Sequence, residues 1–108
     1  MRICFPVQEA KGLESNLDMN IMTAKAFLIV DTQTNEIKVI PRGGLNPVAP
    51  LEKEMFEFVV VMSIGKMAVQ KFNEKRKRVY KCHGMTVAKN VDMMKRHQLQ
   101  EIRPEQCT

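Results

Sequence analysis

Two unbroken apolar runs constrain the fold of this chain more than any other feature. Residues 26–30 read Ala-Phe-Leu-Ile-Val, and residues 58–62 read Phe-Val-Val-Val-Met. Runs of this length suit strands, and a strand that is apolar at every position is buried on both faces. The sequence therefore predicts a sheet that other layers cover on both sides.

Shorter patterns predict the neighbouring strands. Ile3, Phe5 and Val7 alternate with other side chains, which is the period of a strand over residues 2–7. Polar residues 31–36 form a turn, and residues 37–40 return as the second strand of a hairpin. Residues 79–82 include a lysine, which is typical of a strand at the edge of a sheet.

The remaining segments predict helices. A short helix begins near Pro50, Ser63 caps a second helix over residues 64–75, and Thr86 caps a last one. The apolar stripe of the second helix is expected to comprise Ile64, Met67, Ala68 and Phe72. Because strand and helix alternate in this half of the chain, its strands should be parallel and its crossovers right-handed.

Length and composition indicate one domain. The chain of 108 residues is expected to form a domain over residues 1–103 and a tail over residues 104–108. No apolar run approaches the ~20 residues of a membrane span, and no signal region precedes the first strand, so we expect a cytoplasmic protein. Cys4, Cys82 and Cys107 lack C-x-x-C spacing, which favours reduced thiols.

Three polar segments follow predicted strands and should meet at one edge of the sheet. They are residues 8–20, 63–66 and 83–86. Ligands of open α/β sheets bind beyond the carboxyl ends of the strands, and a helix start offers free N–H groups to an anion. The turn that ends at Lys66 is therefore a candidate anion cradle, with Lys11 as a second charge; the alternative is an ordinary strand-to-helix turn.

Few side chains suit a metal ion. His83 stands at a strand end that faces the crevice, so it is the candidate metal ligand; the alternative is a solvated loop histidine. Cys4 lies within a strand and is expected to behave as a small buried hydrophobe. Met19 and Met22 lie in or beside the first loop, where their thioethers are a weak signal for a soft metal.

A basic run, Lys75-Arg-Lys-Arg78, lies between the second helix and the next strand. The start of a parallel strand is at the edge opposite the crevice, so this run should not hold a ligand bound there. It either complements the helix dipole as a solvated cap or docks an acidic partner or nucleic acid. With a net charge of +5 the chain permits an anionic partner, although the sequence disfavours nucleic acid.

Several motifs together resemble one known family. They are residues 1–7, the Lys11-Gly-Leu13 turn with Ser15, the stretch from Ala24 to Asp31, residues 58–65 and His83-Gly84. This set resembles the nitrogenase iron–molybdenum cofactor biosynthesis domain, the NifX-type module that also ends NifB-type proteins. The resemblance spans residues 1 to about 99.

The resemblance implies a fold and a ligand. The fold would be a three-layer, ribonuclease-H-like α/β domain with a mixed five-stranded sheet of order 3-2-1-4-5, strand 2 antiparallel, and helices on both faces. The ligand would be an iron–sulfur or molybdenum-containing cluster. The expected cofactor-binding residues are Lys11, Gly12, Ser15, Asn20, Ser63, Gly65, Lys66 and Gly84.

The chain differs from the family at a position that would matter for metal binding. Many members have histidine where this sequence has Asn20, and asparagine is a poor ligand for soft metals. The crossover between Pro41 and Phe58 is also shorter than usual, which would leave one sheet face less covered and favour a homodimer.

Two functions follow as expectations. The first is a non-enzymatic carrier of a metal–sulfur cofactor, with other cofactor-assembly proteins as partners. The second is a degenerate family member that acts as an interaction or regulatory module through its basic face, without a cluster. An enzyme is not expected, because the first strand holds no acid and no nucleophile–base motif appears.

Overall fold

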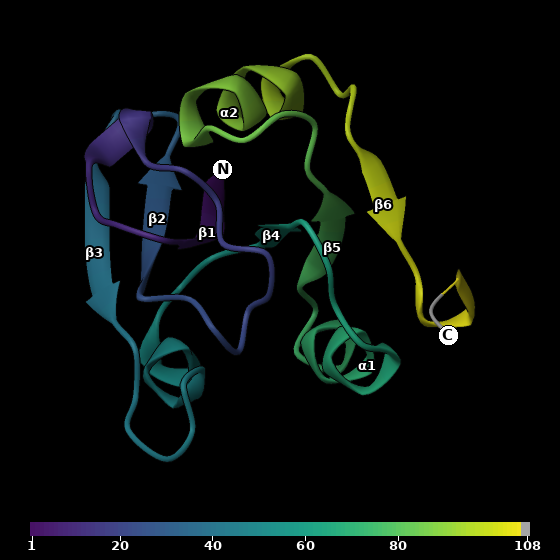
Figure 1. Ribbon diagram of the computed structural model, residues 1–108. Coiled ribbons are helices and arrows are strands. Elements are labelled where there is room, and N and C mark those ends of the chain that lie inside the picture. The colour runs from purple at the N-terminus through teal and green to yellow at the C-terminus, as the bar shows by residue number, and fades with distance from the viewer. Residues whose placement is uncertain (107–108) are drawn as a thin grey trace.

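A single mixed sheet organises the computed structural model, which describes residues 1–106 (Figure 1). The strands lie in the order β3-β2-β1-β4-β5-β6. Their bounds are β1 (Arg2–Val7), β2 (Ala26–Asp31), β3 (Ile37–Pro41), β4 (Phe58–Val61), β5 (Arg78–Lys81) and β6 (Gln100–Ile102). Strand β4 runs parallel to β1 and β5, whereas the other three pairings are antiparallel.

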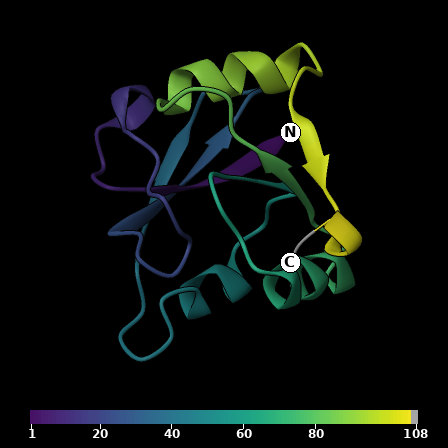
Figure 2. The same cartoon turned by 45° about the vertical axis from the view of Figure 1, so that its right-hand side comes forward.

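Helices cover both faces of this sheet. The α-helices are α1 (Lys66–Glu74) and α2 (Val87–Lys95), and the 3-10 turns are η1 (Gly12–Glu14), η2 (Ala49–Lys53) and η3 (Pro104–Gln106). Figure 2 shows α2 on one side of the sheet and α1 with η2 on the other. The two apolar runs are thus buried between layers, and Val60 has no exposed surface, as the sequence predicts.

The alternation along β1 divides the core into two halves. Ile3, Phe5 and Val7 pack with α2, while Cys4 packs on the opposite face with residues of η2 and α1. Each half is apolar because successive side chains of a strand point to opposite faces. The hairpin of β2 and β3 pairs beside β1, as expected.

The predicted five-stranded sheet is wrong by one strand. The order 3-2-1-4-5 is present, but β6 pairs antiparallel with β5, so β5 is not the edge of the sheet. A three-residue strand reading Gln-Glu-Ile carries too few positions to show an alternation. The mixed α/β fold class is confirmed, and the likeness to the ribonuclease H fold remains a prediction.

The start of α1 also differs from the expectation. The helix begins at Lys66 with Gly65 as its N-cap, and no side chain caps it, so Ser63 is not the cap. The expected apolar stripe is confirmed at Ile64 and Phe72, which pack against the core, but Val69 is the fully buried residue of the helix and Met67 is 72% exposed. By contrast, Thr86 caps α2 as predicted, because its side chain accepts a hydrogen bond from the Lys89 N–H.

The end of the described chain is ordered against α1. Residues 104–106, expected to belong to a tail, form η3 beside α1. The remaining part of that tail, including Cys107, lies outside the described residues. Within residues 1–106 no helix is long and apolar enough to cross a membrane.

Candidate functional site

The loop after β1 folds back onto the sheet instead of extending into solvent. The Gln8 N–H donates to the Asn16 carbonyl at 2.9 Å, and the Asp18 N–H donates to the Pro6 carbonyl at 2.9 Å. Leu17 forms a bridge with Val7 and is fully buried. The loop is therefore a defined structure at the carboxyl end of β1.

Ser15 fixes the tip of this loop. Its side chain is fully buried, and its Oγ accepts a hydrogen bond from the Lys11 N–H at 2.7 Å. Gly12, between them, has a φ of 61°, a left-handed conformation that glycine adopts without strain. The Lys11 ammonium remains exposed, with its Nζ 3.9 Å from Glu9 Oε1. Of these predicted residues, only Lys11 offers charge to a ligand; Gly12 and Ser15 shape the loop.

The turn between β5 and α2 is held by a residue that the sequence analysis missed. Asn90 is fully buried in α2, and its Oδ1 accepts a hydrogen bond from the His83 N–H at 2.8 Å. Its Nδ2 donates to the carbonyl oxygens of Thr86 at 2.8 Å and Gly84 at 3.4 Å. The sequence signal for this role is an asparagine within the apolar face of a helix, because a buried amide needs hydrogen-bond partners.

The structure brings these two segments together, as the sequence predicts. The Val87 N–H donates to the Ser15 carbonyl at 3.0 Å, and the Leu17 N–H donates to the Met85 carbonyl at 2.8 Å. Asn16 and Thr86 form a further bridge. Lys11, Gly12 and Ser15 therefore lie in a loop that is joined to the turn containing Gly84.

Asn20 is engaged within its own loop. Its Oδ1 accepts a hydrogen bond from the Met22 N–H at 2.8 Å, and its backbone N–H donates to Asp18 Oδ1 at 3.1 Å. Thr23 Oγ1 donates to the same Asp18 oxygen. At this position the amide closes a turn, which is what short polar side chains do in loops.

Residues 63–66 form the third predicted segment. The backbone N–H groups at Lys66, Met67 and Ala68 have no hydrogen-bond partner within residues 1–106, as expected for a first helical turn. A Cβ placed on Gly65 would meet nothing within 4 Å, so the approach to these donors is open. Ser63 instead borders a hollow shared with Lys81 and Gln100.

The contact between this third segment and the first loop is limited. Across the described chain, no hydrogen bond or ion pair joins residues 63–66 to residues 11–20. The chain that follows each segment comes closer together: Met22, after the first loop, and Ala68, after the third segment, line the same groove beside α1. The edge thus holds one tightly bonded pair of segments and a separate, open helix start.

The edge holds no ready set of metal ligands. His83 is exposed, and residues 1–106 contain no group of three or more His, Cys, Asp or Glu side chains that suits a metal ion. Burial raises the pKa of Cys82, and complete burial raises the pKa of Cys4 much further. Both thiols therefore stay protonated at neutral pH, and a thiol is a poor metal ligand.

Exposed methionines are a second feature that the sequence predicted only in part. Met19 and Met22 are exposed in the first loop, as expected, but Met67 at the start of α1 and Met85 in the α2 turn are exposed as well. All four lie on the segments that follow β1, β4 and β5. Together they add soft, polarizable side chains to an edge that otherwise offers N–H groups and lysines.

These features define a mixed α/β protein whose loops gather at the carboxyl edge of its parallel strands, where anions are favoured. The chain belongs to the dinitrogenase iron–molybdenum cofactor family, whose sequence model matches residues 1–97. No curated protein sequence matches it.

Solved structures share this fold. The apo form of the orange protein from Desulfovibrio gigas superposes with a TM-score of 0.82 at 22% identity, over 94% of this chain and 92% of that one. A proposed NifB protein from Thermotoga superposes with a TM-score of 0.76 at 24% identity, over 93% of this chain and 91% of that one. A proposed dinitrogenase from Methanocaldococcus jannaschii gives 0.69 at 21% identity, over 94% of each chain. At these identities the likeness concerns the fold alone.

Proposed function

We propose that this protein is a non-enzymatic carrier of an anionic metal–sulfur cofactor, such as an iron–molybdenum cluster. The match of the family to residues 1–97 is the observation that carries the proposal. The cluster is cargo in this proposal, taken up from one cofactor-assembly protein and passed to another.

The carboxyl edge of the sheet is the binding site in this proposal. The unpaired N–H groups at the start of α1 and the exposed Lys66 attract an anion. Met67 and Met85 present soft side chains to the sulfur atoms of a cluster. Hydrogen bonds and charge account for binding here, because the described residues supply no full ligand set.

His83 is a side chain at this edge that suits direct ligation. It is exposed, and its backbone is fixed by the 2.8 Å hydrogen bond to Asn90, so its imidazole is free to reach a cluster metal. A single imidazole ligand gives a weak and exchangeable bond. Weak attachment suits a carrier, which has to release its cargo.

Binding of tetrathiomolybdate, a soluble molybdenum–sulfur anion, tests the proposal. Protein prepared without oxygen is mixed with the anion and desalted, and bound molybdenum is measured by mass spectrometry. We expect about one equivalent to be retained at low salt and most of it to be lost at about 1 M salt, where the Debye length falls to about 3 Å. The absence of retained molybdenum at low salt would contradict the proposal.

A second function is favoured by a different observation. The basic residues that end α1 and begin β5 lie at the opposite edge of the sheet, since Arg78 pairs with Phe58 at the start of β4. Three lysines of this region border a groove with an apolar floor. An interaction module that docks an acidic partner is therefore the alternative, and it does not need a cluster.

A further inference from the structure

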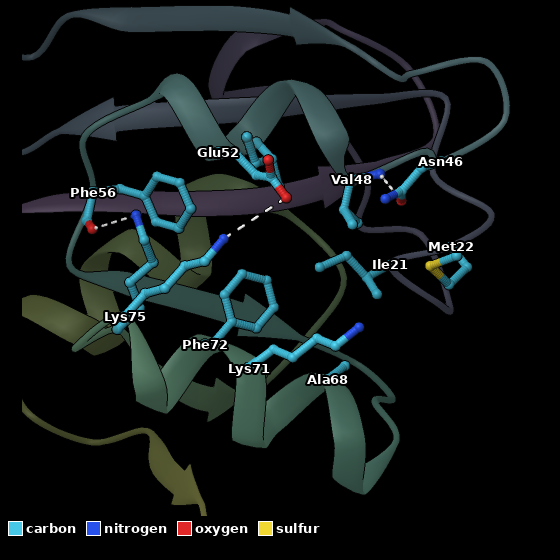
Figure 3. Close-up of a pocket in the computed structure, with 12 residues that line it drawn as sticks. Ile21, Met22, Asn46, Val48, Glu52, Phe56, Ala68, Lys71, Phe72 and Lys75 are labelled. Carbon is cyan, nitrogen blue, oxygen red and sulfur yellow. Dashed lines mark hydrogen bonds and ion pairs between the residues drawn. The ribbon is translucent and has the colours of Figure 1, made fainter.

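A groove of about 130 Å³ runs between α1 and the crossover segment that contains η2 (Figure 3). Figure 3 shows Ile21 and Val48 pointing into it from one side and Phe72 from the other. Apolar side chains form most of its walls and floor, among them Ile21, Val48, Leu51, Phe56, Ala68 and Phe72. The crossover between β3 and β4 provides a single 3-10 turn, η2, on this side of α1.

The rim of the groove carries an excess of positive charge. Lys71, Lys75 and Lys77 border it, and Glu52 is the one acidic residue of its lining. Lys75 Nζ lies 3.8 Å from Glu52 Oε1, so a weak ion pair spans the groove from α1 to η2. Lys71 is exposed and makes no hydrogen bond or ion pair with the described part of the chain. The rim therefore offers at least one unpaired cation.

Lys77 is held in a different way. Its Nζ donates to the Phe56 carbonyl at 3.2 Å and lies 3.4 Å from the centre of the Phe56 ring. Lys77 is half-buried, and this burial lowers the pKa of its ammonium. An anion beside a partly desolvated cation interacts more strongly than it would in open solvent.

The size of the groove restricts what it can accept. A cavity of about 150 Å³ holds one benzene molecule, whereas sites for drug-sized molecules measure about 300–1,000 Å³. The groove therefore suits one aromatic or branched side chain. Protein interfaces commonly depend on such an anchor, which enters a small apolar pocket while polar contacts surround it.

We infer that this groove docks an acidic segment of a partner protein, with one large apolar side chain inserted between α1 and η2. Carboxylates that flank the anchor pair with Lys71 and Lys75; Glu52 already pairs with Lys75 from within the chain. Arg76 and Arg78 extend the positive surface beyond the end of α1. The inference rests on the alternative function proposed above and specifies its site and partner; it is independent of cofactor carriage, because it uses the side chains of the groove and holds whether or not a cluster binds.

Matched peptides test this inference. The probe is a blocked pentapeptide with phenylalanine between two pairs of aspartates, and the controls replace phenylalanine by alanine or the aspartates by lysines. Binding is followed by amide chemical shifts of the isotope-labelled protein. We expect the first peptide to shift the signals of Ala68, Phe72 and Val48, and each control peptide to bind about tenfold more weakly or not at all.

Charge-reversal variants locate the site. Lys71→Glu should weaken binding of the phenylalanine peptide about tenfold, whereas Lys95→Glu, the same change at an exposed position of α2, should alter it less than about twofold. Ala68→Leu fills the groove without changing the charge. It should weaken binding of the phenylalanine peptide and leave the residual binding of the alanine peptide unchanged. Thermal unfolding confirms that each variant folds.

Several results would overturn the inference. Equal binding of the phenylalanine and alanine peptides would mean that the groove takes no anchor. Tighter binding of an oligonucleotide, equally affected by Lys71→Glu and unaffected by Ala68→Leu, would assign the surface to nucleic acid. Concentration-dependent dimers that Ala68→Leu abolishes would show that a second copy of the chain covers the groove.

Discussion

Single residues in the turn between β5 and α2 decide how the carboxyl edge is built. Gly84 has a φ of 82°, and a Cβ on it would lie 2.9 Å from Lys89 Cδ. Asn90 fixes the same turn through the backbone of His83 and Thr86. The shape of this turn is thus a property of the fold, present before any ligand arrives.

Replacement of Gly84 tests that dependence. Gly84→Ala should lower the free energy of unfolding by about 1–2 kcal/mol, because an alanine in the left-handed region is strained. Gly44→Ala is the matched control, since its new Cβ meets nothing within 4 Å and its φ lies outside that region. Urea unfolding should show the control unchanged or slightly more stable. Equal stability of the two variants would contradict the role given to Gly84.

At the residue scale, the sequence predicted positions better than roles. Gly12 and Gly84 were expected in the polar segments that follow strands, and both lie there with positive φ. Ser15 and Asn20 were expected to face a ligand, yet each uses a side-chain oxygen to accept a backbone N–H from its own loop. A polar side chain in a loop suits either role, and only the local backbone geometry decides between them.

At the scale of elements, helix α1 confirms part of its expected apolar stripe. Ile64 and Phe72 pack against the core, although Ile64 does so from the turn before the helix, which begins at Lys66. Val69 is fully buried, whereas Met67 is exposed. Met67, Ala68 and Val69 are consecutive apolar residues, so the sequence alone did not decide which of them faces the core.

A pair of substitutions on α1 checks the observed face. Val69→Ala should lower the free energy of unfolding by about 1.5–3 kcal/mol, because it removes fully buried methyl groups and leaves a cavity. Met67→Ala, two positions earlier, should change it by less than about 0.5 kcal/mol, since that side chain is exposed. Urea unfolding measures both. If Met67→Ala were the more damaging change, the helix would be rotated from the position described.

The strands divide into those that the sequence predicts well and one that it does not. Strands β2 and β4 were predicted from their continuous apolar runs, and their burial follows from layers on both faces. Strand β6 is short and half-buried, and its pairing with β5 depends on the path of the chain after α2. Pairing of that kind is a tertiary effect that a local pattern does not contain.

At the scale of the whole molecule, α1 links two surfaces with different chemistry. Its first turn lies at the carboxyl edge of the parallel strands, with free N–H groups and Lys66. Its later turns, with Lys71 and Phe72, form a wall of the apolar groove (Figure 3). Cofactor binding and partner docking are therefore assigned to separate parts of one helix, which makes the two separable by substitution.

The most direct test compares tetrathiomolybdate binding by two charge reversals on that helix. Lys66→Glu should weaken binding about tenfold, equivalent to about 1.4 kcal/mol, because it places a negative charge beside the N–H donors. Lys71→Glu makes the same change in net charge next to the groove and should alter binding less than about threefold at moderate salt, where the Debye length is about 8–10 Å. If Lys71→Glu abolished binding while Lys66→Glu bound normally, the cofactor site would not be at the carboxyl edge and the account would be contradicted.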